Sequence, residues 1–112
     1  MTGVLDRGRI TDRGALELRT GELDGWTLSE DRIERAWVFE DFATAVRFIS
    51  EMAPHAEELD HHPELFTVYD RVEVTLTTHD ADGLTEYDFE LARRLDRVAA
   101  TLAQKTTGDP ST

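Results

Sequence analysis

Alternation of apolar and polar residues marks two short segments in the first third of the chain. Residues 26–28 alternate in the manner of a short strand, and the longer segment Arg32–Phe39 keeps four residues on one parity: Ile33, Arg35, Trp37 and Phe39. Polar residues at 29–31 separate the two segments, so the pattern predicts an antiparallel hairpin. Trp26 and Trp37 occupy strand positions and are expected in the core.

Apolar residues then recur at helical spacing and predict the most strongly amphipathic helix of the chain: Phe42, Ala45, Val46, Ile49, Met52, Ala53 and Ala56. Asp41 suits the N-cap of this helix. Pro54 lies inside the pattern and is expected to kink the helix. Pro63 disfavours helical geometry in the residue before it, which predicts a helix end near Leu59 or Asp60.

The second half of the chain predicts extended structure followed by a helix. Over Leu65–Thr78, one face is expected to hold Val68, Val72, Val74 and Leu76, and the other Tyr69, Glu73, Thr75 and Thr77. Residues 80–83 are expected to form a loop. Thr85 then suits the N-cap of a final helix, whose inner stripe holds Leu91, Ala92, Leu95, Val98, Ala99 and Leu102.

Together these segments predict an α+β fold, an antiparallel β-sheet with two to three α-helices packed on one face. The third helix is a short one over residues 10–23, which Gly14 and Gly21 weaken. We expect one domain over residues 1–112, with disorder at about 1–9 and 105–112.

Composition narrows the classes of function. The 112 residues include 24 acidic and 12 basic side chains, for a formal net charge of -12. Such a surface repels phosphate backbones and anionic lipid, so we expect no nucleic-acid and no membrane binding. No apolar run approaches the roughly 20 residues of a membrane span. The absence of cysteine excludes thiol nucleophiles and disulfides and is consistent with a cytoplasmic protein.

Three of the four histidines lie at predicted ends of elements. His61 and His62 follow the long helix, and His79 ends the extended segment. Histidine donates and accepts protons near neutrality, so this group is a candidate acid–base set. Two other interpretations stay open: a polar helix terminus with favourable dipole contacts, and a metal site completed by Asp60 or Asp80.

Two acidic groups near the histidines have structural explanations. Thr85 and Asp88 have the spacing of a capping box, in which the acid bonds back to the N-cap and would also fix the loop that carries His79. Glu57, Glu58 and Asp60 form an acidic run that fits a solvated helix face. One of these carboxylates could instead orient a histidine through its second ring nitrogen.

Taken together, the chain resembles the pterin-4a-carbinolamine dehydratase family, also called 4a-hydroxytetrahydrobiopterin dehydratases. The residues that fill the family pattern in order are Glu57, His61, His62, Pro63, Tyr69, His79 and Asp88. The resemblance runs from about Gly25 to Leu102. Leu65 stands where animal members have tryptophan, which affects the wall of the pocket, and Asp70 replaces the usual asparagine.

The resemblance implies a dehydratase, a hydro-lyase that converts 4a-hydroxytetrahydropterin to quinonoid dihydropterin and water in pterin cofactor recycling. It implies His61 and His79 as the acid–base pair and His62 as a positioning partner that also helps at the hydroxyl, with no metal and no cofactor. Substrate-binding residues implied by the family are Asp60, His61, His62, Pro63, Thr77, Thr78, His79 and Asp80. Glu57 and Asp88 would support them.

The family resemblance also implies which partners the protein has. Members form homo-oligomers, so we expect a dimer or a tetramer, with the apolar stripe of the final helix and the sheet edges as contact candidates. A functional link to an aromatic amino acid hydroxylase is implied, because such an enzyme produces the hydroxylated pterin. The alternative is a non-catalytic interaction or assembly protein on the same fold, a dimerisation cofactor or a RuBisCO assembly factor. A metal-binding protein is a third hypothesis.

Overall fold

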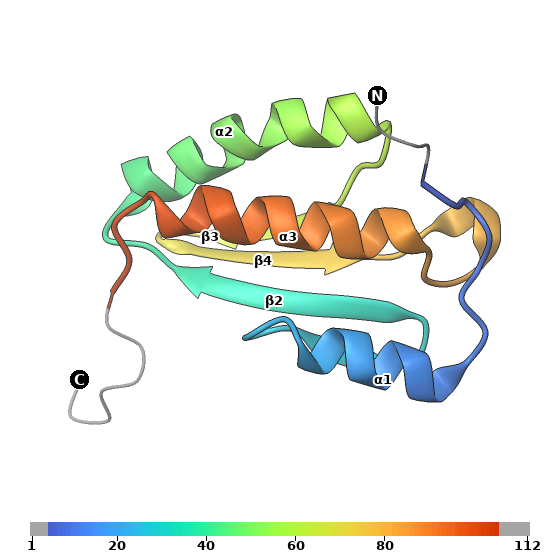
Figure 1. Cartoon of the computed structure of the whole chain (residues 1–112). Helices are drawn as coiled ribbons and strands as arrows, with labels where there is room; N and C mark the ends of the chain where they lie inside the picture. The colour runs from blue at the N-terminus through green and yellow to red at the C-terminus, as the bar shows by residue number, and fades with distance from the viewer. Residues whose placement is uncertain (1–4, 106–112) are drawn as a thin grey trace.

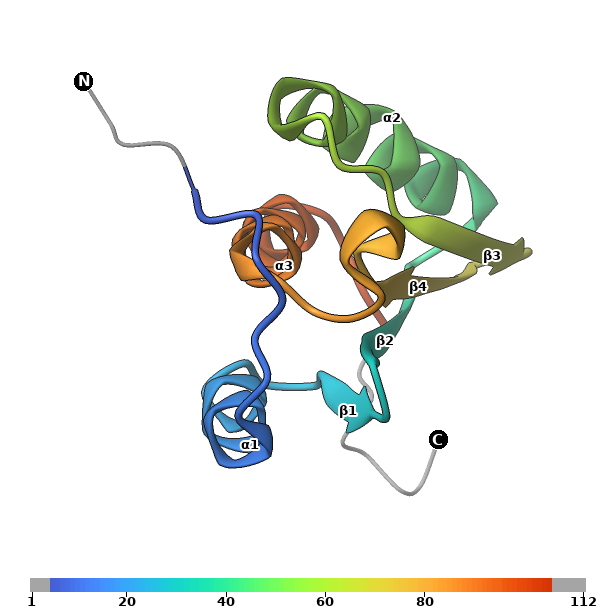
Figure 2. The ribbon, with the colours of Figure 1, turned by 90° about the vertical axis from the view of Figure 1, so that its right-hand side faces the viewer.

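Four antiparallel strands form one sheet in the computed structural model, which describes residues 5–105. The strands are β1 (Thr27–Ser29), β2 (Arg32–Val38), β3 (Glu64–Val68) and β4 (Arg71–Leu76), in the spatial order β1-β2-β4-β3 (Figure 1). Three helices lie on the same side of this sheet (Figure 2): α1 (Arg13–Gly21), α2 (Phe42–Leu59) and α3 (Glu86–Ala100). The predicted α+β architecture is confirmed.

The core lies between the helices and the inner face of the sheet. Ile33 and Trp37 of β2 and the alternate residues of β4 point into it, as the period of a strand requires. Trp26 packs edge to face on Trp37, with ring centroids 5.8 Å apart. Both indoles are almost fully buried, as expected.

The apolar stripe of α3 faces this core. Leu91, Ala92 and Leu95 have no exposed surface. The stripe is therefore covered by the chain's own sheet, and the expectation that it offers a contact to another copy is wrong. Of the two contact candidates, the sheet edges remain.

The extended segment after α2 consists of two strands, where one continuous segment was expected. β3 and β4 pair from Val68 opposite Arg71 to Glu64 opposite Thr75, so Tyr69 and Asp70 make the turn. Tyr69 has a φ of 52°, in the left-handed region that glycine or asparagine usually marks, and neither is present. The turn also places Val68 away from the core, 55% exposed, against expectation.

The ends of α2 follow from its cap residues. Asp41 accepts the backbone N–H of Thr44 at 2.8 Å and begins the helix. The helix runs through Pro54 and ends where Asp60 takes a left-handed conformation, with φ 50°. The backbone N–H of His61 then bonds back to the carbonyl of Ala56 at 3.0 Å. This C-terminal closure fixes the direction in which His61 leaves the helix.

At the N-terminal side, the described chain begins with an extended segment that crosses the start of α3. Residues 5–9 lead to Ile10, whose N–H bonds to the carbonyl of Leu84 at 2.8 Å. The parts of the predicted disorder at residues 1–4 and 106–112 fall outside the described residues. None of the helices in the described part of the chain combines the length and hydrophobicity that a membrane crossing requires.

Candidate functional site

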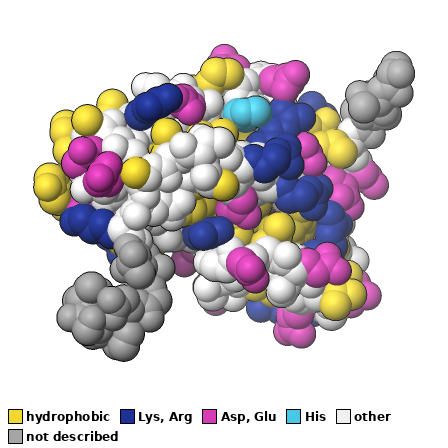
Figure 3. All heavy atoms as spheres, turned by 60° about the vertical axis from the view of Figure 1, so that its left-hand side comes forward, with side chains coloured by type: hydrophobic (Ala, Val, Ile, Leu, Met, Phe, Trp, Pro, Cys, Tyr) yellow, Lys and Arg dark blue, Asp and Glu magenta, His cyan; other side chains and the backbone are white. Residues whose placement is uncertain are grey.

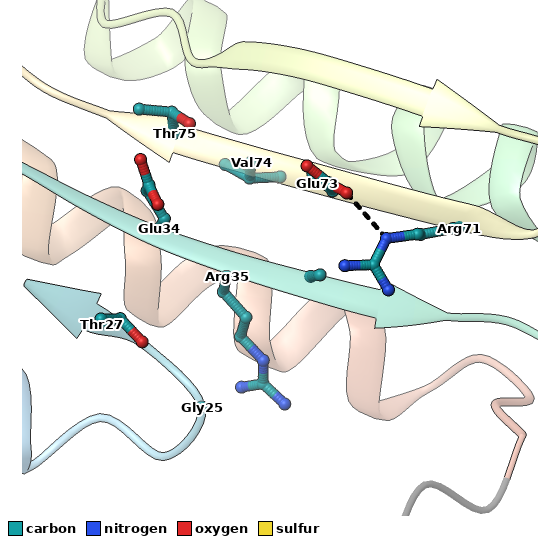
Figure 4. Close-up of a pocket in the computed structure, with 9 residues that line it drawn as sticks. Gly25, Thr27, Glu34, Arg35, Arg71, Glu73, Val74 and Thr75 are labelled. Atoms are coloured by element: carbon teal, nitrogen blue, oxygen red, sulfur yellow. Dashed lines mark hydrogen bonds and ion pairs between the residues drawn. The ribbon is translucent and has the colours of Figure 1, made fainter. Parts of the chain in front are cut away.

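Two hollows of similar size have different chemistry. One, of about 320 Å³, lies on the open face of the sheet, where Arg71 pairs with Glu73 at 2.7 Å (Figure 4). The described residues that line it include no histidine. The other, of about 300 Å³, is lined by His61 together with Thr78, Asp80, Ala81, Thr85, Tyr87 and residues 7–9. Because it is lined by a histidine and the first is not, this second hollow is the candidate site; its volume is at the low end of the ~300–1,000 Å³ usual for ligand pockets.

Three segments that are distant in sequence form this second hollow. The end of α2 brings His61, the short 3-10 helix η1 (His79–Ala81) follows β4, and α3 begins with Glu86. Figure 2 views the molecule from this end, with the N-terminal segment passing alongside α3. Element ends surround the cavity, as is common where a scaffold holds functional side chains.

A buried carboxylate connects these segments. Asp88 has no exposed surface, and its Oδ1 lies 2.6 Å from Nε2 of His61. Its Oδ2 accepts the hydroxyl of Thr78 at 2.7 Å and the backbone N–H of Thr85 at 2.9 Å. Every contact of this carboxylate is thus a hydrogen bond to a group that can donate, the arrangement that a buried charge requires.

The capping box explains why Asp88 occupies this place. Thr85 is the N-cap of α3, and Asp88 is its N3 residue, with both reciprocal bonds formed. One side chain therefore caps the helix through Oδ2 and contacts His61 through Oδ1. The sequence predicted the first contact and gave no signal for the second.

The contact with Asp88 assigns the ring nitrogens of His61. With Asp88 as a carboxylate, its oxygen can only accept, and in that state Nε2 of His61 carries the hydrogen. In the neutral ring Nδ1 is then the lone-pair nitrogen. The side chain of His61 is 11% exposed. The structure therefore holds one imidazole in a defined tautomer at a cavity wall.

His62 and His79 lie near the cavity but do not line it. His62 is exposed and its Nε2 is 2.7 Å from Oε2 of Glu57. His79 is exposed and its Nε2 is 3.4 Å from Oε2 of Glu64. Each is adjacent in sequence to a residue bonded to Asp88, namely His61 and Thr78. The three histidines therefore occupy one end of the molecule.

Some of the remaining predicted site residues line the cavity and others do not. Thr78 and Asp80 line the cavity with His61. Thr77 is buried and donates to the carbonyl of Asp31 at 2.8 Å, which holds the hairpin of β1 and β2. Asp60 and Pro63 belong to the connection from α2 to β3 and do not line the cavity.

The first turn of α3 is held by a further ion pair. Arg19 of α1 donates two hydrogen bonds of 2.7 Å to Glu86. This guanidinium holds the pKa of the Glu86 carboxyl below its usual value, and the carboxylate raises the pKa of Arg19. The pair fixes the start of the helix that carries Asp88.

No metal geometry is formed in the described part of the chain. Among residues 5–105, no three or more His, Asp or Glu side chains group in a way that could hold a metal ion. Asp88, the carboxylate closest to His61, is fully engaged by hydrogen bonds.

Several cavity residues were missed in the sequence. Tyr87 contributes its ring, and Arg7 lies over it at 4.4 Å from the centroid. Arg9 also lines the cavity. These residues carry no motif, and the N-terminal segment was expected to be disordered, so no sequence signal pointed to them.

Comparisons with known proteins agree on one family. A sequence model described as "Pterin 4 alpha carbinolamine dehydratase" matches residues 10–98. A Sinorhizobium fredii protein named "Putative pterin-4-alpha-carbinolamine dehydratase" is 48% identical over 91 residues, 80% of this chain and 87% of that protein. A Burkholderia vietnamiensis protein of the same name is 52% identical over 89 residues, 75% of this chain and 87% of that protein.

Solved structures share the fold. A transcriptional coactivator/pterin dehydratase from Brucella melitensis superposes with a TM-score of 0.78 at 41% identity, covering 82% of this chain and 99% of that chain. A pterin dehydratase-like protein described as a RuBisCO assembly factor in the alpha-carboxysome has a TM-score of 0.56 at 23% identity. It covers 66% of this chain and 86% of that chain, and at this identity it shows the fold alone.

Proposed function

The chain belongs to the pterin 4 alpha carbinolamine dehydratase family, and from this premise we propose that it dehydrates 4a-hydroxytetrahydropterin to quinonoid dihydropterin. The observation that carries the proposal is the contact of His61 with the buried carboxylate of Asp88 at the wall of the cavity. Imidazole is the side chain best suited to proton transfer at neutral pH. Its fixed tautomer supports a role in chemistry rather than in surface solvation.

The proposed reaction breaks one bond to carbon and one to hydrogen. The hydroxyl on C4a leaves with a proton as water, and N5 loses its proton. The electron pair of the N5–H bond then forms the C4a=N5 double bond of the quinonoid product. One group must donate a proton to the leaving hydroxyl and another must accept the proton of N5, so two imidazoles suffice. Because one proton is given and one is gained, the total charge of the two imidazoles is the same before and after the reaction.

In this proposal, His61 and His79 exchange protons with the substrate through their free nitrogens. His62 positions the pterin and helps at the hydroxyl. Of the residues that the family resemblance implies for ring binding, Thr78 and Asp80 line the cavity and are proposed to contact the ring. Asp60, Pro63 and Thr77 lie outside the lining and are proposed to hold the segments that carry the histidines. Glu57 supports His62 at 2.7 Å, and Asp88 supports His61.

Stopped-flow kinetics test the proposal. The substrate is generated in the cell and its absorbance decay is followed with the wild type, His61→Ala and His79→Ala. Loss of one general acid or base should lower the enzymatic rate by about 10²–10⁴-fold. His55→Gln is the control, because His55 lies on α2 outside the cavity lining.

A folded wild type that leaves the decay at its spontaneous rate would refute the proposed activity. The non-catalytic interaction or assembly protein would then be the function to pursue. The Brucella relative's description combines coactivator and dehydratase, so both functions occur in descriptions of this fold.

We also propose a homo-oligomer that forms through the β3 edge of the sheet. All five residues of β3 are exposed, and an uncovered edge strand with apolar side chains favours pairing with another chain.

A pterin-dependent aromatic amino acid hydroxylase is the proposed source of the substrate. A cytoplasmic location stays a prediction.

A further inference from the structure

The N-terminal segment places two guanidinium groups at the candidate site. Arg7, Gly8 and Arg9 line the same cavity as His61 and Thr78. Arg7 lies over the Tyr87 ring, with its Cζ 4.4 Å from the centroid. The Arg9 side chain passes over Gly83, where an added Cβ would come within 2.7 Å of its Cδ. These contacts hold both side chains at the cavity mouth.

Neither guanidinium has a carboxylate partner. Within residues 5–105, no Asp or Glu oxygen lies within 4.0 Å of Arg7 or Arg9, although acidic side chains outnumber basic ones two to one. Other arginines are paired, for example Arg19, Arg35 and Arg94. Figure 3 shows the same interleaving of basic and acidic side chains on another face. The cavity mouth therefore has two cations available to an anion.

Several acidic groups lie near the two guanidinium groups. Asp6 is exposed, and its Oδ1 accepts the backbone N–H of Gly8 at 2.7 Å. Asp80 lines the cavity and Asp82 is exposed, with its carbonyl oxygen 3.5 Å from a terminal nitrogen of Arg9. Asp88 is buried, and both of its oxygens accept hydrogen bonds. Asp80 is the one carboxylate among the described residues that line the cavity, so the two guanidinium groups outnumber it there.

The two arginines also lie outside the residues that the family model matches. The family match begins at residue 10, directly after Arg9. The residues proposed for the reaction, such as His61 and His79, fall within the match. A cavity wall built by residues 7–9 therefore suits a role in the choice among substrates of one chemical class.

We propose that Arg7 and Arg9 form an anion subsite, which makes this site prefer pterins whose ring substituent carries a carboxylate or a phosphate. This inference rests on the proposed function for the pterin ring itself. Guanidinium groups bind both anions through charge-assisted hydrogen bonds. With the ring beside His61 and Thr78, its substituent would reach the cavity mouth.

Equilibrium binding of stable oxidised pterins tests the subsite. Affinities of 6-hydroxymethylpterin, pterin-6-carboxylate and 6-hydroxymethylpterin phosphate are measured by pterin fluorescence. We expect the wild type to bind at least one anionic pterin more tightly, and Arg7→Gln or Arg9→Gln to weaken that ligand about 5–10-fold. Neither substitution should change the affinity for the neutral pterin. The two anionic ligands show which anion is preferred.

Arg97→Gln is the matched control, since Arg97 is an exposed arginine of α3 outside the cavity lining. It should leave all three affinities unchanged, and added salt should reduce only the advantage of the anionic pterins. Equal wild-type binding of neutral and anionic pterins would overturn the subsite while leaving the proposed function intact. If the folded protein binds no pterin, the proposed function fails, and the subsite fails with it.

Discussion

The contact between His61 and Asp88 combines a structural and a proposed chemical role in one side chain. Asp88 caps α3 through one oxygen and contacts Nε2 of His61 at 2.6 Å through the other. A carboxylate that accepts from Nε2 holds the imidazole in one tautomer and in one orientation. Asp88 is therefore a positioning residue in the proposed mechanism.

Asp88→Asn tests this positioning role. An asparagine oxygen can still accept from Thr78 and Thr85, but its amide would face Nε2 of His61 with a donor and favour the other tautomer. We expect kcat to fall about 10–100-fold with little change in KM and an altered pH–rate profile. Circular dichroism should show an intact fold. A merely structural role would lower stability and leave kcat per folded molecule unchanged.

The sequence predicted which residues belong to the candidate site more accurately than which of these residues contact one another. The His-His-Pro group and His79 stand out because of their spacing, and the capping box is visible because its members are three residues apart. His61 and Asp88 are 27 residues apart, and only the packing of α2 against α3 brings them together. Arg7 and Tyr87 meet in the same way and carry no local pattern.

Between elements, the pair of Arg19 and Glu86 joins α1 to the start of α3. Because the pKa of Glu86 is lowered in the folded state, the pair's contribution is present above the ordinary value of 4.5. It is lost as the pH falls through the lower, folded-state pKa. The pair is about a quarter to a third exposed, which limits its contribution.

Glu86→Gln should lower the free energy of unfolding by about 0.5–1 kcal/mol at pH 7. The difference from wild type should disappear at pH values well below 4.5, where both proteins carry an uncharged group. Urea denaturation at several pH values measures this. Glu40→Gln is the control, since Glu40 is exposed and has no ion pair among the described residues. A pH-independent difference would contradict the pair's role.

Pro54 is the weak point of α2. Proline has no N–H for the carbonyl four residues earlier, and this side chain is exposed, so packing does not require it. Pro54→Ala should raise the free energy of unfolding by about 1–3 kcal/mol, reduced by the greater freedom of the unfolded chain. Chemical denaturation measures the gain. Equal or lower stability would show that the helix geometry depends on proline.

Helices were predicted more accurately than the turn between β3 and β4. Capping residues and a repeating apolar face mark α2 and α3 directly. The turn at Tyr69 and Asp70 has no glycine, proline or asparagine, and apolar residues continue on both sides. A short-range pattern therefore suggested one extended segment, and only pairing across the sheet distinguishes two strands.

For the molecule as a whole, the uncovered β3 edge is the main exposed apolar feature near the site. Leu65, Phe66, Val68 and Tyr69 are 40–62% exposed. Monomers rarely leave such an edge uncovered. The open face and this edge are a consequence of placing all three helices on one side of the sheet.

Phe66→Lys should shift the protein toward the monomer, because a lysine on an edge strand opposes pairing. Sedimentation velocity measures the change over a range of concentrations. Leu18→Lys is the matched control, since Leu18 is 67% exposed on α1, away from β3. A wild type that is monomeric, or an assembly that Phe66→Lys leaves intact, would contradict an interface at this edge.

A double-mutant cycle on turnover tests the central claim most directly, that His61 acts in pterin dehydration through Asp88. Stopped-flow rates are measured for the wild type, His61→Ala, Asp88→Asn and the double variant. If the two residues act as a unit, Asp88→Asn should lower the rate in the wild type and add almost nothing once His61 is gone. Losses that multiply would show that the two residues act independently and would contradict the account.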